Sequence, residues 1–167
     1  HVFARDVLGA RPEHRFYSSS KLFFAYPLAN AFFAGLRLGA TVVLDPEWPD
    51  PARVAAMVER HQPHIFFSVP TLYRRLVDAG VRFRGLHAAV SAGEACPPAL
   101  AREWQAMTGV PLVNGYGTTE TLSLVLYRTP EMESAHPTPL TTIHPEQLTS
   151  GEVETWRLWF AHPAVAL

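Results

Sequence analysis

The sequence alternates short, apolar, strand-like segments with longer helix-like ones, and this alternation restricts the fold more than any other feature. Strands are expected at residues 41–44, 65–69, 86–91 and 110–114. Helices are expected at residues 23–38, 51–61, 70–80 and 97–108. Strands that alternate with helices of this length form βαβ units with right-handed crossovers. The sequence therefore predicts an α/β fold, with a mainly parallel sheet of about four strands and flanking helices.

Composition limits the partners that such a fold is expected to have. The chain has 167 residues, a formal net charge of −1 and 48% hydrophobic residues, which is enough apolar material for a core. This charge gives no electrostatic reason to expect nucleic acid or an anionic membrane as a partner. The apolar segment 22–33 is too short to span a bilayer, and Pro27 and Asn30 interrupt it.

Cysteine and histidine usage points to a reducing compartment. The single cysteine, Cys96, excludes an internal disulfide, and no His/Cys cluster has the spacing of a structural zinc site. No positively charged leader precedes an apolar run at the start of the sequence. We therefore expect a cytoplasmic protein.

Polar turns follow the last two expected strands. Ser91-Ala92-Gly93-Glu94 follows one strand, and Gly115 to Glu120 follows the next. Because parallel neighbours have their carboxyl ends at the same edge of a sheet, both turns are expected to line one crevice. Solvated turns are the alternative, since Asn and Gly suit turns. Two converging turns, each ending in a carboxylate, favour a ligand site.

Four stretches in this order carry a family resemblance: KLFFAYPLANAFFAGLRLGATVVL, IFFSVPTLYRRL, VSAGEACPPAL and NGYGTTE. Together they resemble the adenylate-forming acyl-CoA synthetases, and the benzoate-CoA ligase branch in particular. The resemblance runs from about residue 3 to about residue 124. It implies that the predicted sheet corresponds to one subdomain of such an enzyme.

The resemblance also implies roles for individual residues. Tyr116 would stack on an adenine ring, Thr119 would bond the phosphate and the substrate carboxylate, and Glu120 would hold Mg²⁺ if the metal is retained. These roles match an aromatic face to a purine and a hard carboxylate to a hard cation. The remaining implied binding residues line the nucleotide cleft or the aryl pocket: Ala92, Gly93, Glu94, Gly117 and Thr118 for the cleft, and Tyr26, Ala29 and Asn30 for the pocket.

Departures from the family pattern alter the expected activity. The phosphate-gripping loop ending in Pro-Lys-Gly and the catalytic lysine of the lid are not recognisable, and the only lysine is Lys21. ATP-dependent ligation with Mg²⁺ is therefore not expected of this chain alone. Pro27 and Ala29 stand where the benzoate-type pattern has glycines, so the acyl substrate does not carry over.

The C-terminal part divides the chain into three expected units. Residues 1–127 form the core subdomain, and residues 128–148 read as a proline-rich linker. Residues 149–167 are expected to form an amphipathic helix, with Thr149 and Glu152 as a capping box, and they resemble the start of the family lid. This junction suggests a naturally shortened gene product; a frame error, a pseudogene or an excised ligase fragment are the alternatives.

One functional hypothesis is an enzyme that hydrolyses or transfers an acyl or aryl thioester. Glu120 would act as general base on water, with Thr118 and Thr119 facing the oxyanion. His87 and His136 are further candidate bases, and Cys96 is a candidate nucleophile at a helix start. Structural roles are the alternatives: Cys96 as a small core residue, His87 as a core histidine, and Glu120 as an inherited position without chemistry.

The other hypothesis is a non-catalytic module that binds an aryl acid, a nucleotide or a carrier protein. The carrier of a thioester is either coenzyme A or a carrier-protein arm, and the residues do not distinguish them. Aromatic residues near the C-terminus must be covered by the chain's own sheet or by a partner. Loss of the neighbouring subdomain that the resemblance implies should also expose apolar area, so a homodimer is expected. A remnant of an aryl-CoA ligase is the third hypothesis.

Overall fold

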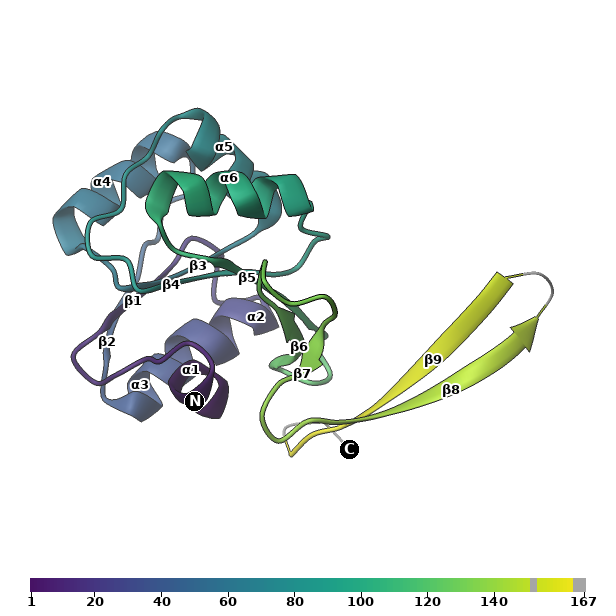
Figure 1. The fold of residues 1–167 in the computed structure, drawn as a ribbon. Helices are drawn as coiled ribbons and strands as arrows, with labels where there is room; N and C mark the ends of the chain where they lie inside the picture. The colour runs from purple at the N-terminus through teal and green to yellow at the C-terminus, as the bar shows by residue number, and fades with distance from the viewer. Residues whose placement is uncertain (151–152, 164–167) are drawn as a thin grey trace.

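The computed structural model describes residues 1–150 and 153–163 and shows a three-layer α/β/α body with a separate β-hairpin (Figure 1). The sheet has seven strands in the order β2-β1-β3-β4-β5-β6-β7. The parallel strands are β1 (Arg15–Ser18), β2 (Thr41–Val43), β3 (Ile65–Ser68), β4 (Ala88–Ser91) and β5 (Leu112–Gly117); β6 (Leu124–Arg128) and β7 (His136–Pro137) are antiparallel additions. The α/β class and the mainly parallel sheet are thus confirmed.

Three amphipathic helices cover one face of the sheet, and their boundaries follow local signals. They are α4 (Pro51–His61), α5 (Pro70–Asp78) and α6 (Pro98–Thr108). The Asp50 side chain caps α4 by accepting a hydrogen bond from the backbone N–H of Arg53 at 2.8 Å. Gly109, at φ +74°, ends α6 in the left-handed conformation. Both signals were read correctly from the sequence.

Shorter helical segments cover the other face (Figure 1). They are α1 (Val2–Asp6), α2 (Ala25–Pro27), the π-helix η1 (Leu28–Phe33) and α3 (Ala34–Leu38). The helix expected at residues 23–38 is present from Ala25 to Leu38, but its middle, Leu28–Phe33, is a π-helix. Pro27 has no backbone N–H for the helical ladder, and the π-helix begins directly after it.

Alternating side chains along the strands build a core on each face of the sheet. On β3, Ile65 and Phe67 pack toward α1–α3, whereas Phe66 packs toward α4–α6 with the buried Trp104. All four are fully buried. This period of two follows from strand geometry, and burial on both faces explains why the strand reads as a continuous apolar run.

The C-terminal region differs from the sequence expectation. The structure places a two-stranded antiparallel hairpin there, formed by β8 (Thr142–Ser150) and β9 (Val153–Ala161), instead of an amphipathic helix. β-branched and aromatic residues dominate β9 and suit a strand. The expected linker at 128–148 is also wrong in part, because β7 and most of β8 lie within it. Glu152 of the expected capping box lies outside the described residues.

The hairpin projects away from the α/β body (Figure 1). Its described contacts with the body include the rings of Phe160 and Tyr116, whose centroids lie 6.3 Å apart. Among the helices that the structure describes, none is long and apolar enough to cross a membrane.

Candidate functional site

A cavity of about 620 Å³ runs along the carboxyl ends of the five parallel strands. Each strand contributes the residues that follow it: Lys21 after β1, Trp48 after β2, Val69 after β3, Gly93 after β4 and Thr118 after β5. The sequence expected a crevice between the turns after β4 and β5. The structure has a longer one, because all five strands end at the same edge.

The two polar turns meet at this cavity as expected. Ala92, Gly93 and Glu94 line it together with Gly117, Thr118 and Thr119. The carboxylate of Glu94 accepts hydrogen bonds from the Thr71 hydroxyl at 2.6 Å and the Thr71 backbone N–H at 3.2 Å. Glu94 therefore joins the turn after β4 to the first turn of α5.

Position 117 requires glycine because the backbone of Ser123 lies very close to it. A Cβ atom at this position would lie 2.3 Å from the Ser123 carbonyl oxygen, which belongs to the backbone. Gly93 has φ +88°, a conformation that side chains with a Cβ rarely adopt. These two glycines allow the strand ends to turn directly beside the cavity.

Tyr26 forms a wall of the cavity and is fixed at both ends. Its hydroxyl donates to the Val90 carbonyl at 2.8 Å, and its backbone carbonyl accepts from the Asn30 side-chain amide at 3.0 Å. Burial raises the pKa of the Tyr26 phenol well above its usual value, so the group stays neutral. Asn30 is buried and also accepts from the Ser123 hydroxyl at 3.4 Å. Asn30 thus supports the wall from behind, and Ala29 does not line the cavity.

Tyr116 and Glu120 lie outside the lining. Tyr116 belongs to β5 and pairs with Leu126, and its side chain is 53% exposed. Glu120 lies in the exposed turn next to Thr119. Hydrogen bonds from its own backbone N–H and from Thr118 lower the pKa of the Glu120 carboxyl. The implied nucleotide and metal roles of these two residues stay predictions.

Cys96 and the two histidines do not reach the cavity. Cys96 is buried in the core under α4–α6, and α6 begins only at Pro98, so Cys96 does not occupy the helix start. Burial raises the pKa of the Cys96 thiol, which disfavours the thiolate that a nucleophile needs. His87 precedes β4 at the opposite, amino edge of the sheet, exposed and with its ring centroid 4.8 Å from that of His14. It is therefore neither a core histidine nor next to the cavity. His136 lies in β7, exposed at the antiparallel side.

Several lining residues were missed by sequence reasoning: Lys21, Phe24, Trp48 and Arg75. Lys21 follows β1, a strand that the sequence pattern did not predict. Trp48 follows a strand that it did predict. The rule that carboxyl ends of parallel strands share an edge, applied to that strand, would have indicated Trp48.

The family resemblance implies a nucleotide and Mg²⁺, and the residues fit these groups only in part. The Thr118 and Thr119 hydroxyls and the Gly93 turn are suitable for a phosphate-bearing ligand. Tyr116 is not in the lining, and no group of three His, Cys, Asp or Glu residues within 1–150 and 153–163 has metal-binding geometry. We therefore derive no reaction step through a nucleotide or a metal.

Comparisons with known proteins agree with this architecture. The sequence profile of the AMP-binding enzyme family matches residues 2–147. The chain is 42% identical over 125 residues to the 3-hydroxybenzoate–CoA ligase of Aromatoleum sp. (strain CIB), covering 72% of this chain and 24% of that enzyme. It is 43% identical over 132 residues to the benzoate–CoA ligase of Thauera aromatica, a match that covers 75% of this chain and 24% of that enzyme.

A solved structure extends the likeness to nearly the whole chain. The benzoate CoA ligase from Burkholderia xenovorans LB400 superimposes with a TM-score of 0.85 at 30% identity, covering 99% of this chain and 36% of that one. The chain spans about a quarter of the length of the curated relatives it matches.

Proposed function

Because the chain belongs to the AMP-binding enzyme family and is benzoate-CoA-ligase-like, we propose that its cavity binds the aryl part of an aromatic carboxylic acid or of its thioester. The cavity at the carboxyl ends of β1–β5 carries this proposal. Its volume of about 620 Å³ lies within the range of ligand sites. Its wall combines apolar residues with a few polar groups, as ligand sites do.

The polar groups of the lining suit an anionic or carbonyl-bearing ligand. Thr118 and Thr119 offer hydroxyl donors at one end, and Lys21 and Arg75 add two cations. Among the described residues, Arg75 forms no ion pair, so its guanidinium is free to bind a carboxylate. The apolar wall around Tyr26 and Leu72 would cover the ring.

Titration calorimetry with benzoate and 3-hydroxybenzoate tests this proposal, with hexanoate as an aliphatic control. We expect saturable binding of the aromatic acids and weaker binding of hexanoate. Arg75→Gln should weaken binding of the aromatic acids by at least about tenfold, because a hydrogen bond to a charged group contributes about 1.5–3 kcal/mol.

Arg82→Gln is the matched control, because Arg82 is an exposed arginine outside the cavity lining. It should leave binding unchanged. Absence of saturable binding by the wild-type chain, or equal loss in both arginine variants, contradicts the proposal.

Thioester hydrolysis or acyl transfer is the second candidate function. Glu120 directly follows the two cavity-lining threonines, which places a carboxylate next to the lining. Its lowered pKa leaves it ionised at neutral pH but makes it a weaker base than an ordinary glutamate. In the proposed hydrolysis, Glu120 takes a proton from water while the water oxygen bonds to the acyl carbon. The C–S bond then breaks, and the proton passes to the leaving thiolate, whether coenzyme A or a carrier-protein arm.

Mass spectrometry of the protein incubated with aryl and acyl thioesters, with and without Mg-ATP, tests this chemistry. Release of free acid without ATP, lost in Glu120→Gln, supports hydrolysis. Intact thioesters together with saturable binding leave only the binding function. Formation of an adenylate that depends on ATP contradicts the expectation that this chain does not ligate.

A further inference from the structure

Trp48 is an exposed aromatic wall at the β2 end of the cavity. Its side chain is 74% exposed although it lines the cavity. The Lys21 ammonium lies 5.7 Å from the centroid of the indole ring. An indole face next to a mostly apolar cavity is suited to pack on a planar ligand group.

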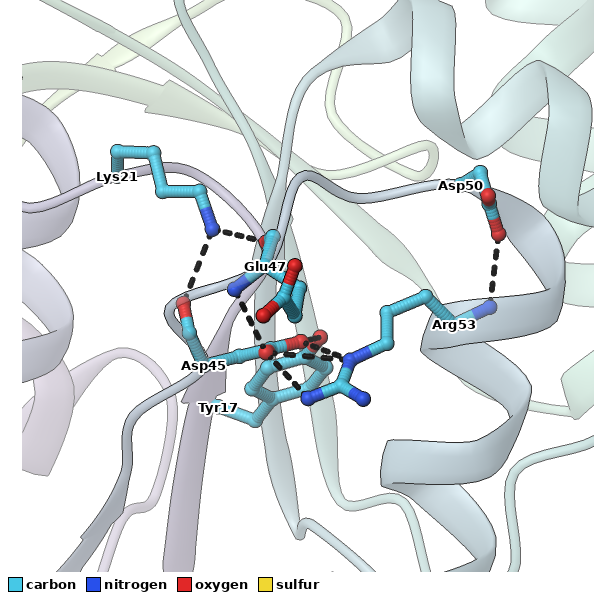
Figure 2. A network of polar contacts seen from close by, with 6 residues as sticks. All are labelled: Tyr17, Lys21, Asp45, Glu47, Asp50 and Arg53. Atoms are coloured by element: carbon cyan, nitrogen blue, oxygen red, sulfur yellow. Dashed lines mark hydrogen bonds and ion pairs between the residues drawn. The ribbon is translucent and has the colours of Figure 1, made fainter.

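The loop that carries Trp48 is anchored before and after it (Figure 2). The Asp45 carboxylate, only 3% exposed, accepts hydrogen bonds from the Arg53 guanidinium at 2.6 Å and 3.0 Å and from the Glu47 backbone N–H at 3.1 Å. The Lys21 ammonium donates to the carbonyls of Asp45, at 2.9 Å, and of Glu47. After Trp48, Asp50 caps α4.

This arrangement holds the backbone around Trp48 and leaves the indole uncovered. None of these hydrogen bonds is made by the indole, and the Lys21 ammonium lies over its ring. Breaking the ion pair between the buried Asp45 carboxylate and Arg53 would leave a buried charge without a partner, which costs free energy. The ion pair therefore stabilises the conformation of the loop.

The position of Trp48 decides which ligands can touch it. β2 and β5 are separated by four strand spacings, or about 19 Å. A single-ring acid whose carboxylate binds Thr118 and Thr119 near β5 is much shorter than this distance and does not reach Trp48. An acid held at the same place but extended by a second ring comes closer to Trp48.

We propose that Trp48 determines specificity by packing on the distal part of extended aryl ligands, and that Asp45 is the positioning residue that holds Trp48 in place. This inference rests on the proposed function, because it requires an aryl ligand in the cavity. It adds the prediction that the site distinguishes aromatic acids by length.

The test measures the ratio of affinities for biphenyl-4-carboxylate and benzoate by calorimetry. We expect Trp48→Ala to lower this ratio about tenfold, since loss of an aromatic contact and its buried area costs roughly 1.5 kcal/mol. Trp156→Ala is the matched control, because Trp156 is 54% exposed but lies on the hairpin, outside the lining. Its ratio should equal that of the wild type.

Asp45→Asn tests the positioning role through two measurements, the affinity ratio and the ¹⁹F resonance of position 48, which a general loss of stability would not change. The neutral amide keeps the shape of the side chain and weakens the bonds to Arg53. We expect the affinity ratio to fall, and the ¹⁹F resonance of 5-fluorotryptophan at position 48, assigned with Trp48→Phe, to shift or broaden while the other three tryptophan resonances stay in place.

The outcomes separate the two proposals. If the wild-type chain binds neither acid, the proposed function fails. If it binds both acids and Trp48→Ala keeps the wild-type ratio, the cavity function stands and the specificity role of Trp48 is overturned. An unchanged ratio and an unchanged position-48 resonance in Asp45→Asn overturn the positioning role of Asp45.

Discussion

At the scale of single residues, the Asp45–Arg53 ion pair couples folding to pH. The Arg53 guanidinium beside Asp45 holds the pKa of this carboxyl below its usual value. A group whose pKa is depressed by folding stabilises the protein above its unfolded pKa, about 3.9 for Asp, and loses that contribution as the pH falls through the folded value. The stabilisation by Asp45 is therefore complete at neutral pH and disappears in acid.

We expect Asp45→Asn to lower the free energy of unfolding by about 1–3 kcal/mol at pH 7. The difference from the wild type should shrink progressively below about pH 4. Urea unfolding followed by circular dichroism between pH 2.5 and 7 measures both. Glu146→Gln is the control, because the Glu146–Arg157 pair on the hairpin is exposed and should contribute little. A difference that stays constant with pH would contradict the role of the Asp45 charge.

The surroundings of Cys96 shift its pKa upward, whereas those of Asp45 shift its pKa downward. Burial raises the pKa of its thiol, so the thiolate is scarce, and the side chain is only 9% exposed. We expect iodoacetamide at pH 8 to alkylate the native chain at least about tenfold more slowly than the urea-unfolded chain, because reaction needs local opening. Intact-mass spectrometry follows the adduct. Equal rates in the two states would restore Cys96 as a candidate nucleophile.

At the scale of elements, the success of sequence reasoning depended on how many apolar residues each segment holds. The βαβ order from β2 to β5 is predictable because strands such as β3 are continuous apolar runs between helices that begin at a proline. β1 has only Phe16 and Tyr17 as apolar residues between polar flanks, so its pattern is too short to detect. The polar turns after β4 and β5 followed from topology, but Lys21 did not, because its position depends on β1.

The hairpin shows a different reason for failure. In β9, Val153, Trp156 and Phe160 have helical spacing, while Trp156, Leu158 and Phe160 have the period of a strand. The apolar pattern is therefore ambiguous, and pairing with β8 decides the outcome. The richness in aromatic and β-branched residues was the available signal.

The hairpin is expected to be dispensable for folding of the α/β body. Neither of the two core clusters contains a described residue beyond Tyr127. We expect a chain ending at residue 141 to keep the circular dichroism spectrum and the urea midpoint of the body. A chain ending at residue 123 should not fold, because it lacks Leu124 and Val125, which are buried in the body. Loss of cooperative unfolding in the longer truncation would show that the hairpin belongs to the folding unit.

At the scale of the whole molecule, the two edges of the sheet have different characters. The carboxyl edge carries the cavity, the tight glycine turns and the anchored Trp48 loop. The amino edge carries three histidines that precede β1, β3 and β4, with His14 stacked on His64 at 5.1 Å. Burial lowers the pKa values of His14 and His64, so both favour the neutral form. The cavity and this histidine cluster thus lie at opposite ends of the strands.

The hairpin face is the feature that bears most on assembly. Trp156 and Leu158 are two positions apart in β9, so their side chains lie on the same face of the strand, and both are exposed. Exposed apolar surface of this kind favours association, and a stable contact buries about 800 Å² on each partner.

We therefore expect the chain to form a homodimer through the hairpin, with sedimentation velocity showing a monomer–dimer equilibrium that depends on concentration. Trp156→Glu with Leu158→Lys should shift it to monomer, whereas Phe33→Glu, an exposed apolar position on η1, should not. A dimer lost in Phe33→Glu but kept in the hairpin variant would move the interface to the η1 face, and a monomer at every concentration would contradict the homodimer.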